Sequence, residues 1–199
     1  MTASRFGEIM STTDRRDMWK LCESMYRKSD IKTNAVIHGI VHESKALEAF
    51  SKATLIKTTE AGLFVHPNFP FLGATPDALA VPNSVVEVKC LYNARDQCIV
   101  PGPSFPSLQT SSNGEYHLKT NHKWYAQVQG QMACARKAHC YFVIYTFRDL
   151  YVEKISFNKD FFDSVMTPKL HYFYNKYWRL FLCSKIARLD DPKLLCDAE

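Results

Sequence analysis

The segment at 84–90, SVVEVKC, constrains the fold most, because it places two charged side chains within a strongly apolar stretch. Its valines favour a strand that is mostly buried in a sheet, and side chains alternate between the two faces of a strand. Glu87 and Lys89 therefore share one face, while Val86 and Val88 share the other. Burying two charges is costly unless something pairs them, so this strand predicts a polar site.

An aspartate, Asp77, precedes Glu87 by ten residues, in the sequence GATPDA. A metal ion beside Asp77 and Glu87 would compensate the carboxylates, and the backbone carbonyl of Val88 could supply a further oxygen ligand. Such an ion activates water and stabilises the charge of a phosphoryl transition state, with Lys89 as a nearby cation. Taken separately, Asp77 is ordinary turn chemistry and the Glu87–Lys89 pair is typical of an exposed edge strand. Together they predict a nuclease site that uses Mg²⁺, for which Mn²⁺ could substitute.

The helix expected over Ala35–Ser51 carries a third acid. Its apolar residues form one stripe at 100° per residue, and Glu43 falls in the middle of that stripe, whereas Glu48 points away. An acid in this position lies either at the edge of the core or in a site. Beside Asp77 and Glu87, we expect Glu43 to act as a catalytic acid that contacts the metal directly or through water.

The helix expected over Asn121–Arg136 has a polar and aromatic edge. Gln127 and Gln131 lie four residues apart, with Trp124 at a neighbouring angle. A glutamine amide can hold a metal-bound water or a phosphate without adding charge, and an indole can stack on a base. We predict that Gln127 is catalytic and that Trp124 and Gln131 contact DNA. The alternative is a row of surface glutamines.

Two further patterns have simpler interpretations. His38 and His42 have the spacing of two zinc ligands on a helix, but HGIVHE lacks the HExxH order and a third ligand. They are interpreted as histidines at the helix surface or the edge of the core. The aromatic run HYFYNKYWRLF at 171–181 predicts a packed terminal helix or a subunit contact rather than a platform for bases.

Composition suits one compact domain over residues 1–199, with 46% hydrophobic and 23% charged residues. No apolar run reaches the roughly 20 residues of a membrane span, and no secretory signal pattern is present. We therefore expect an intracellular protein of the cytoplasm or nucleus with no membrane partner. The seven cysteines include no CxxC pair and are expected to be reduced and mostly packed. The net charge of +5 favours a polyanionic partner only weakly.

The order of the expected elements is α, βββ, α, ββ, α, preceded by another helix, and it predicts a mixed sheet flanked by helices in an α/β layered domain. The expected strands are Thr54–Lys57, Leu63–His66, Val85–Cys90, Cys140–Thr146 and Leu150–Phe157. The expected helices are Ser4–Arg27, Ala35–Ser51, Asn121–Arg136 and Phe161–Cys183, the last with a break or kink at Pro168. The proline- and serine-rich stretch Val100–Gly114 is expected to be a loop without regular structure.

These motifs, in this order, resemble the family of the phage lambda exonuclease and YqaJ-like viral recombinases within the PD-(D/E)XK nuclease superfamily. HGIVHESKALEAF resembles the G-x-x-x-E helix with Glu43 as its acid, and HPNFPFLGATPDALA resembles the approach to the metal-binding Asp77. VVEVKC resembles the E-x-K strand, YAQVQGQM the helix with the functional Gln127, and ARKAHCYFVIY the next strand. The resemblance covers most of Met1–Phe157 and implies a restriction-endonuclease-like core.

The resemblance extends to the start of the sequence, where TASRF matches the segment that helps to receive a DNA end, with Ser4 at the family's serine. The family's upstream tryptophan and arginine have no counterpart in the sequence. Either they precede the residues present, or another cation such as Arg5 replaces the arginine at a 5′-phosphate. The resemblance also implies a ring-shaped homotrimer and a single-strand annealing partner.

We therefore predict a metal-dependent deoxyribonuclease, specifically a 5′ to 3′ exonuclease on linear double-stranded DNA in recombination or end processing. A structure-selective endonuclease is one alternative, and cleavage of a closed circle would distinguish it. A catalytically silent DNA-binding protein that retains the fold is the other, and DNA binding without any metal-dependent product would distinguish that.

Overall fold

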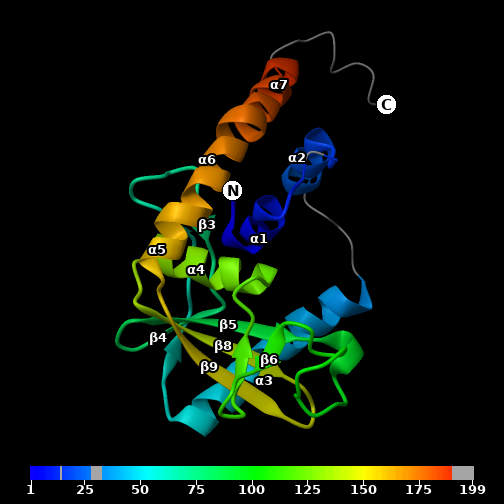
Figure 1. Ribbon diagram of the computed structural model, residues 1–199, viewed down its shortest axis with the longest axis vertical. Coiled ribbons are helices and arrows are strands. Elements are labelled where there is room, and N and C mark those ends of the chain that lie inside the picture. Colours follow the sequence, from blue (N-terminus) through cyan, green and yellow to red (C-terminus); the bar gives the residue numbers. More distant parts are fainter. Residues whose placement is uncertain (14, 28–32, 190–199) are drawn as a thin grey trace.

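A mixed five-stranded sheet forms the centre of this computed structural model, which describes residues 1–13, 15–27 and 33–189 (Figure 1). The strands are β1 (Thr58–Thr59), β4 (Ala78–Ala80), β5 (Ser84–Cys90), β8 (His139–Tyr145) and β9 (Leu150–Ser156), in the order β1-β4-β5-β8-β9. β5 and β8 are parallel, and the other neighbours are antiparallel. This confirms the predicted mixed sheet flanked by helices.

Two helices cover the two faces of the sheet (Figure 1). α3 (Asn34–Thr54) packs on the face that carries Val86 and Val88, with Phe50 in the same buried cluster. α4 (Lys123–Ala135) packs on the opposite face, where Val85 lies in one cluster with residues of that helix. Parallel strands need a crossover, and α4 lies in the connection from β5 to β8. The alternation of β5 thus determines which helix each of its side chains meets.

The sheet is open along one half of β5. β4 pairs only with Ser84–Val86, and β1 continues outward from β4. In the part of the chain that the structure describes, the residues 87–90 have no strand partner on the β4 side, although β8 pairs with them on the other. The charged half of β5 therefore lies beside a gap in the sheet.

A second, helical part packs beyond α4 (Figure 1). It comprises η1 (Ala3–Arg5), α1 (Phe6–Met10), α2 (Met18–Tyr26) and a C-terminal rod of α5 (Lys159–Phe161), η3 (Phe162–Met166), α6 (Thr167–Phe173), η4 (Tyr174–Trp178) and α7 (Arg179–Leu189). Phe173 and Phe181 are buried, and Tyr174 stacks on Phe71 with ring centroids 4.1 Å apart. The aromatic run is therefore the packed terminal helix that the sequence predicted.

Of the break or kink expected at Pro168, the break is wrong, because the rod stays helical through this residue. Pro168 lies in the first turn of α6, directly after the π-helical turn η3. A proline lacks an N–H and disturbs the preceding turn of an α-helix. The wider π turn accommodates the ring without ending the helix.

Three other expectations need correction. α3 continues through Thr54, so the strand expected at Thr54–Lys57 is helix and coil, and β1 begins only at Thr58. The N-terminal helix is interrupted, and Asp17 caps α2 by accepting the N–H of Lys20. The loop at 100–114 contains β6 (Leu108–Thr110), which pairs with β7 (Tyr116–Leu118). The hairpin of β2 (Phe64–Val65) and β3 (Gly73–Ala74) adds a strand that sequence reasoning missed.

The described cysteines agree in part with the prediction that they are reduced and mostly packed. Six described cysteines are free, and Cys22, Cys134 and Cys140 are buried, whereas Cys98 and Cys183 are exposed. Cys196 lies outside the described residues. No helix in the described part of the chain has both the length and the apolar character needed to cross a bilayer.

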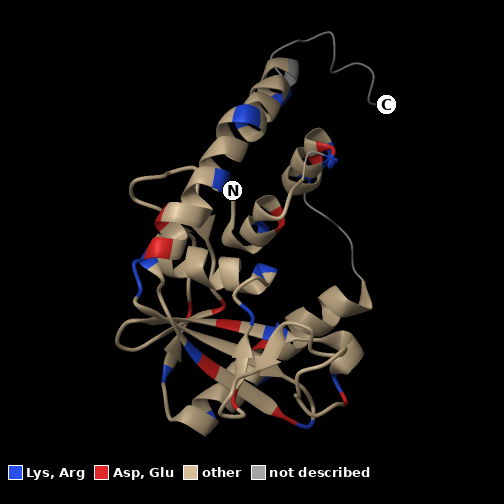
Figure 2. Cartoon of the chain, viewed as in Figure 1, with Lys and Arg blue, Asp and Glu red and all other residues tan. Residues whose placement is uncertain are grey.

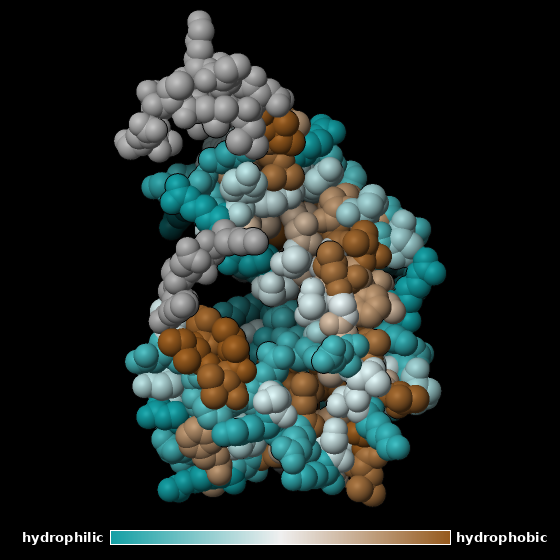
Figure 3. Space-filling model, turned by 180° about the vertical axis from the view of Figure 1, so that it is seen from behind, coloured by the Kyte–Doolittle hydropathy of each residue, from teal (hydrophilic) through white to brown (hydrophobic). Residues whose placement is uncertain are grey.

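One surface of the first half of α3 is apolar (Figure 3). Val36, Ile37, Ile40 and Val41 are exposed there, and Ile40 is the most exposed of them at 70%. Seen from behind, a hollow with hydrophilic walls lies between this end of α3 and the helical part (Figure 3). An apolar edge thus borders a polar recess.

The close packing of α1 against α4 provides a test of the fold. A Cβ atom on Gly130 of α4 would lie 2.4 Å from Cδ2 of the buried Phe6 ring, whereas one on Gly39 of α3 would meet nothing within 4 Å. Alanine favours a helix interior over glycine by about 1 kcal/mol. We expect Gly130→Ala nonetheless to lower the free energy of unfolding by about 1–3 kcal/mol through overpacking.

Gly39→Ala is the matched control, and it should raise the free energy of unfolding by up to about 1 kcal/mol. Urea unfolding of both variants checks the contrast. Equal stabilisation by the two substitutions would contradict the close approach of α1 and α4.

Candidate active site

Asp77 lies at the open edge of the sheet, just before β4. Its Oδ2 accepts the N–H of Val88 at 2.6 Å, and its own N–H donates to the carbonyl of Val86 at 3.1 Å. These bonds continue the pairing with β5 beyond the end of β4. Turn chemistry alone would leave the carboxylate free, whereas here it is fixed against the charged half of β5.

Glu87 is buried on the α4 side of the sheet, with 3% of its surface exposed. Its Oε1 accepts hydrogen bonds from Lys89 Nζ and Gln127 Nε2, each at 2.5 Å, and its Oε2 accepts one from Gln131 Nε2 at 2.5 Å. The interpretation of Glu87 and Lys89 as an exposed pair on an edge strand is therefore wrong. The shared face of Glu87 and Lys89, predicted from strand alternation, is confirmed by their ion pair, and Figure 2 shows an acidic and a basic band along β5.

Lys89 is held by three groups. Besides Glu87, its Nζ donates to Gln127 Oε1 at 3.2 Å and lies 5.5 Å from the ring centroid of Trp124. The ammonium group is thus fixed between an acid, an amide and an indole face. A cation in a fixed position can stabilise charge that develops nearby without a large rearrangement.

The glutamines of α4 are buried, so the alternative of a surface row is wrong. Gln127 and Gln131, four residues apart, both reach Glu87, and the buried Oε1 of Gln131 has no hydrogen-bond partner among the residues that the structure describes. Gln129 lies on another side of the helix, where it bonds to the carbonyl of Ser156 at 3.0 Å and to the N–H of Asn158 at 2.7 Å. Two glutamines therefore belong to the site, and the third joins α4 to the end of β9.

Glu43 approaches the same acids from α3. Its side chain is open to solvent, but partial burial and then the negative charge of Glu87 raise its pKa, while Lys89 opposes the shift. Glu48, expected to point away, pairs with Lys52 at 2.7 Å. Both glutamates are exposed, contrary to the place of Glu43 in the apolar stripe, but only Glu43 lies close enough to Glu87 for that charge to shift its pKa.

Burial, followed by repulsion between the acids, dominates the electrostatics of the site. Burial and then the charge of Glu87 raise the pKa of Asp77 from 3.8 to about 8, and the N–H of Val88 and the charge of Lys89 only partly offset this. Three acids share one lysine among them. Carboxylates brought together in this way favour either a bound proton or a cation.

The donor atoms fit a hard divalent cation such as Mg²⁺, which prefers oxygen ligands. The Val88 N–H faces Asp77, so the Val88 carbonyl faces the same side, because both groups of a strand residue point the same way. Glu87 Oε2 accepts a single hydrogen bond and retains a lone pair. Among residues 1–13, 15–27 and 33–189, no three His, Cys, Asp or Glu side chains form a ready-made cage. Water would complete the coordination, as Mg²⁺ commonly requires.

The N-terminal residues predicted to receive DNA lie on the other side of α4. Ser4 Oγ shares a hydrogen bond with the Thr2 hydroxyl at 3.2 Å. The Arg5 guanidinium is already engaged, with Glu8 at 3.1 Å and the Ser24 hydroxyl at 2.6 Å. The N-terminal segment is tied to β3, because the N–H of Gly73 donates to the carbonyl of Met1.

The two histidines of α3 form a ring contact rather than an evident zinc site. Their ring centroids are 4.2 Å apart, and His42 Nδ1 lies 2.9 Å from the carbonyl oxygen of His38. No third ligand joins them within the described residues. The interpretation as histidines at the edge of the core agrees with the burial of His38.

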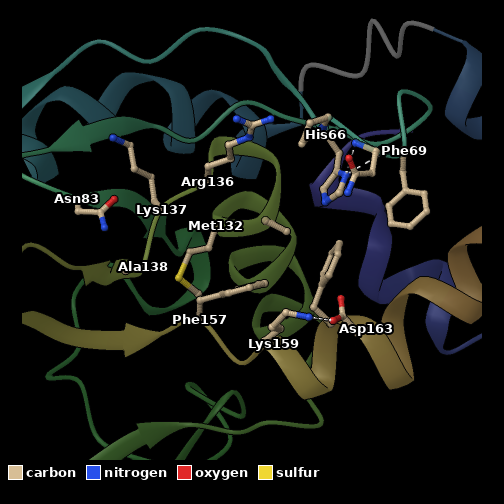
Figure 4. Close-up of a pocket in the computed structure, with 14 residues that line it drawn as sticks. His66, Phe69, Asn83, Met132, Arg136, Lys137, Ala138, Phe157, Lys159 and Asp163 are labelled. Atoms are coloured by element: carbon tan, nitrogen blue, oxygen red, sulfur yellow. Dashed lines mark hydrogen bonds and ion pairs between the residues drawn. The ribbon is translucent and has the colours of Figure 1, made fainter.

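A separate basic cavity of about 600 Å³ lies at the far end of α4 (Figure 4). Arg136 and Lys137 line it, together with Lys159, which pairs with Asp163. None of the predicted catalytic residues lines this cavity. The carboxylates and the cavity are therefore distinct features of the surface.

Known proteins share the sequence pattern and the fold. The family model of the YqaJ-like viral recombinase domain matches residues 1–138. An alkaline exonuclease from Laribacter hongkongensis has a TM-score of 0.71 at 23% identity, over 95% of this chain and 94% of that chain, and the same values hold for its complex with dAMP. A phage-related exonuclease from Haemophilus somnus has a TM-score of 0.65 at 11% identity, over 94% and 96%. No curated protein sequence matches significantly.

The raised pKa of Asp77 predicts a pH-dependent gain in stability on Asp77→Asn. The unfolded chain loses this proton near the ordinary value of 3.8, and the folded protein loses it near 8, so the folded state binds more protons between these values. Stability therefore falls as the pH rises through this window. At pH 8 without metal, Asp77→Asn should raise Tm by on the order of 5 °C, with little effect at pH 4.

Thermal unfolding at both pH values measures this effect. Glu60→Gln, which removes an exposed acid, is the matched control and should change Tm little at either pH. Added Mg²⁺ should reduce this difference in Tm, because it should bind and stabilise the unsubstituted protein more than the Asp77→Asn variant. An equal gain at pH 4 and pH 8 would contradict the raised pKa of Asp77.

Proposed function

Because the chain belongs to the family of YqaJ-like viral recombinase domains, we propose that it is a metal-dependent deoxyribonuclease, acting as a 5′ to 3′ exonuclease on linear double-stranded DNA. One observation carries the proposal: Asp77, Glu87 and Lys89 meet at the open edge of β5. The exonuclease descriptions of two proteins with the same fold support the choice of reaction. Recombination or end processing would be the setting.

The carboxylates would hold the metal. Asp77, Glu87 and the carbonyl of Val88 would bind Mg²⁺ or Mn²⁺, with Glu43 binding directly or through a water. Once bound, such an ion polarises a phosphate oxygen and lowers the pKa of a coordinated water. The burial and the repulsion that raise the pKa of Asp77 support this assignment, since a divalent cation would replace the proton.

The remaining groups would act on the phosphate and the attacking water. Lys89 would orient the water and stabilise the negative charge that develops on the phosphate, because its ammonium group is already fixed by Glu87 and Gln127. Gln127 bonds to both Glu87 and Lys89, so it would hold the carboxylate and the ammonium group in fixed positions relative to each other. Gln131 would hold Glu87 from the other oxygen.

Contacts of this kind would read phosphates and not bases, so cleavage would be independent of sequence. Trp124, beside Lys89, would stack against the substrate. Ser4 and Arg5 as contacts for a DNA end, a homotrimer, a single-strand annealing partner and an intracellular location all remain predictions from the sequence.

Substitution of the central residues tests the chemistry. We expect Asp77→Ala and Lys89→Ala each to lower degradation of linear duplex DNA in Mg²⁺ by about 100-fold or more, since each removes a group that acts on the reacting phosphate. Initial rates on end-labelled DNA measure the loss, and thermal unfolding confirms that each variant is folded. Lys52→Ala, on the outer side of α3, is the matched control and should retain activity. Unimpaired turnover in both site variants would sink the mechanism.

A time course on blunt and overhanging duplexes, with closed circles alongside, tests the mode of cleavage. Early release of a 5′ label with intact circles is the expected result. Early release of a 3′ label would reverse the polarity, and cut circles would indicate an endonuclease. DNA binding without any product in Mg²⁺ or Mn²⁺ would indicate a catalytically silent protein.

A further inference from the structure

Four rings from three separate segments meet beyond the end of β5, and we call them the ring shelf. They belong to His38 and His42 of α3, Tyr92 of η2 (Tyr92–Ala94) and Phe147 of the turn between β8 and β9. Phe147 lies 5.6 Å from His38 and 5.1 Å from His42 between ring centroids, and Tyr92 lies 5.7 Å from His38. The rings thus form one continuous cluster.

The ring shelf adjoins the carboxylates along two elements. His42 directly precedes Glu43 on α3, and Tyr92 lies three residues beyond Lys89, just after β5 ends. Two of the elements that carry the candidate catalytic groups therefore continue into the shelf. A DNA strand with a phosphate at the acids would have its neighbouring nucleotide within reach of the rings.

Phe147 is the outward ring of the shelf, with 49% of its surface exposed. Its position is nevertheless fixed. Its N–H donates to the carbonyl of Arg95 at 2.7 Å, and Thr146 Oγ1 closes the turn by accepting the N–H groups of Arg148 at 3.2 Å and Asp149 at 2.9 Å. A half-exposed aromatic ring on a rigid turn is preorganised for binding, because little conformational freedom remains to be lost.

Two arginines flank the rings. The Arg95 guanidinium lies 4.4 Å from the Tyr92 ring centroid and 3.5 Å from Asp96. Arg148 follows Phe147 in the same turn, is exposed, and has no ion pair with any residue that the structure describes. Aromatic rings beside cations are the combination that binds single-stranded nucleic acid, where rings stack on bases and cations meet phosphates.

We propose that the ring shelf stacks an unpaired nucleobase of the DNA strand whose phosphate lies at Asp77 and Glu87. Phe147 supplies the exposed ring, and the two histidines support it from α3. The base is taken to be unpaired, because an internal base of a duplex keeps both faces stacked and offers neither to a ring. Every base has such a face, so the contact tolerates any sequence. This inference rests on the proposed nuclease function for the position of the strand.

Fluorescence of 2-aminopurine tests the stacking separately from cleavage. The base is placed singly at each of the first positions of single-stranded and frayed-end oligonucleotides, which are bound to the full chain in Ca²⁺. We expect quenching at one or two positions. Phe147→Leu should abolish it and weaken binding on the order of 10-fold, whereas Phe147→Trp should retain it. Trp19→Leu, which removes an aromatic residue of α2 that is 52% exposed, is the matched control and should change neither quantity.

An abasic site separates stacking from a structural role of Phe147. If the ring stacks on a base, the penalty of Phe147→Leu should vanish on an oligonucleotide that is abasic at the quenched position. The same penalty on intact and abasic DNA, or no quenching at any position, would overturn the shelf. Quenching without metal-dependent hydrolysis would support the shelf and contradict the nuclease. Metal-dependent hydrolysis without quenching would support the nuclease and contradict the shelf.

Discussion

The hydrogen bond from the Val88 N–H to the Asp77 carboxylate is the interaction on which the site depends. It occupies the place where a longer β4 would have continued the sheet, so the edge of β5 stays open while its backbone remains partly paired. The same bond holds Asp77 in a buried position close to Glu87, and burial and then the charge of Glu87 raise the pKa of Asp77. The closeness that makes the acids repel one another at this edge also concentrates oxygen donors there.

Packing far from the acids maintains this arrangement. Glu87 is buried only because two glutamines and a lysine occupy its oxygens, and the glutamines come from α4. α4 is in turn positioned by the close approach of Phe6 to Gly130, and Gln129 ties it to the end of β9. A substitution in the contact between α1 and α4 would therefore shift α4 and its glutamines, and so affect the site without changing any of its acids.

The sequence predicted what periodicity controls and missed what depends on short or distant segments. Strand alternation placed Glu87 and Lys89 together, and the helical period brought Gln127 and Gln131 to one side. β3 and β4, with two and three residues, are too short to show a period. The partner of Asp77 is a backbone N–H, which no side-chain pattern reveals. The ring shelf joins residues from segments at least 50 residues apart, so only the fold brings them together.

The two π-helical turns of the C-terminal rod have a consequence for how its aromatic residues meet the rest of the protein. A π turn holds one residue more than an α turn, so it rotates all that follows by about 100° around the axis. Phe162, at the start of the first π turn, and Phe181, beyond the second, are both buried with these turns in place. Loss of a single residue from either turn would leave the helix intact and change its angular phase, turning part of the aromatic surface toward solvent.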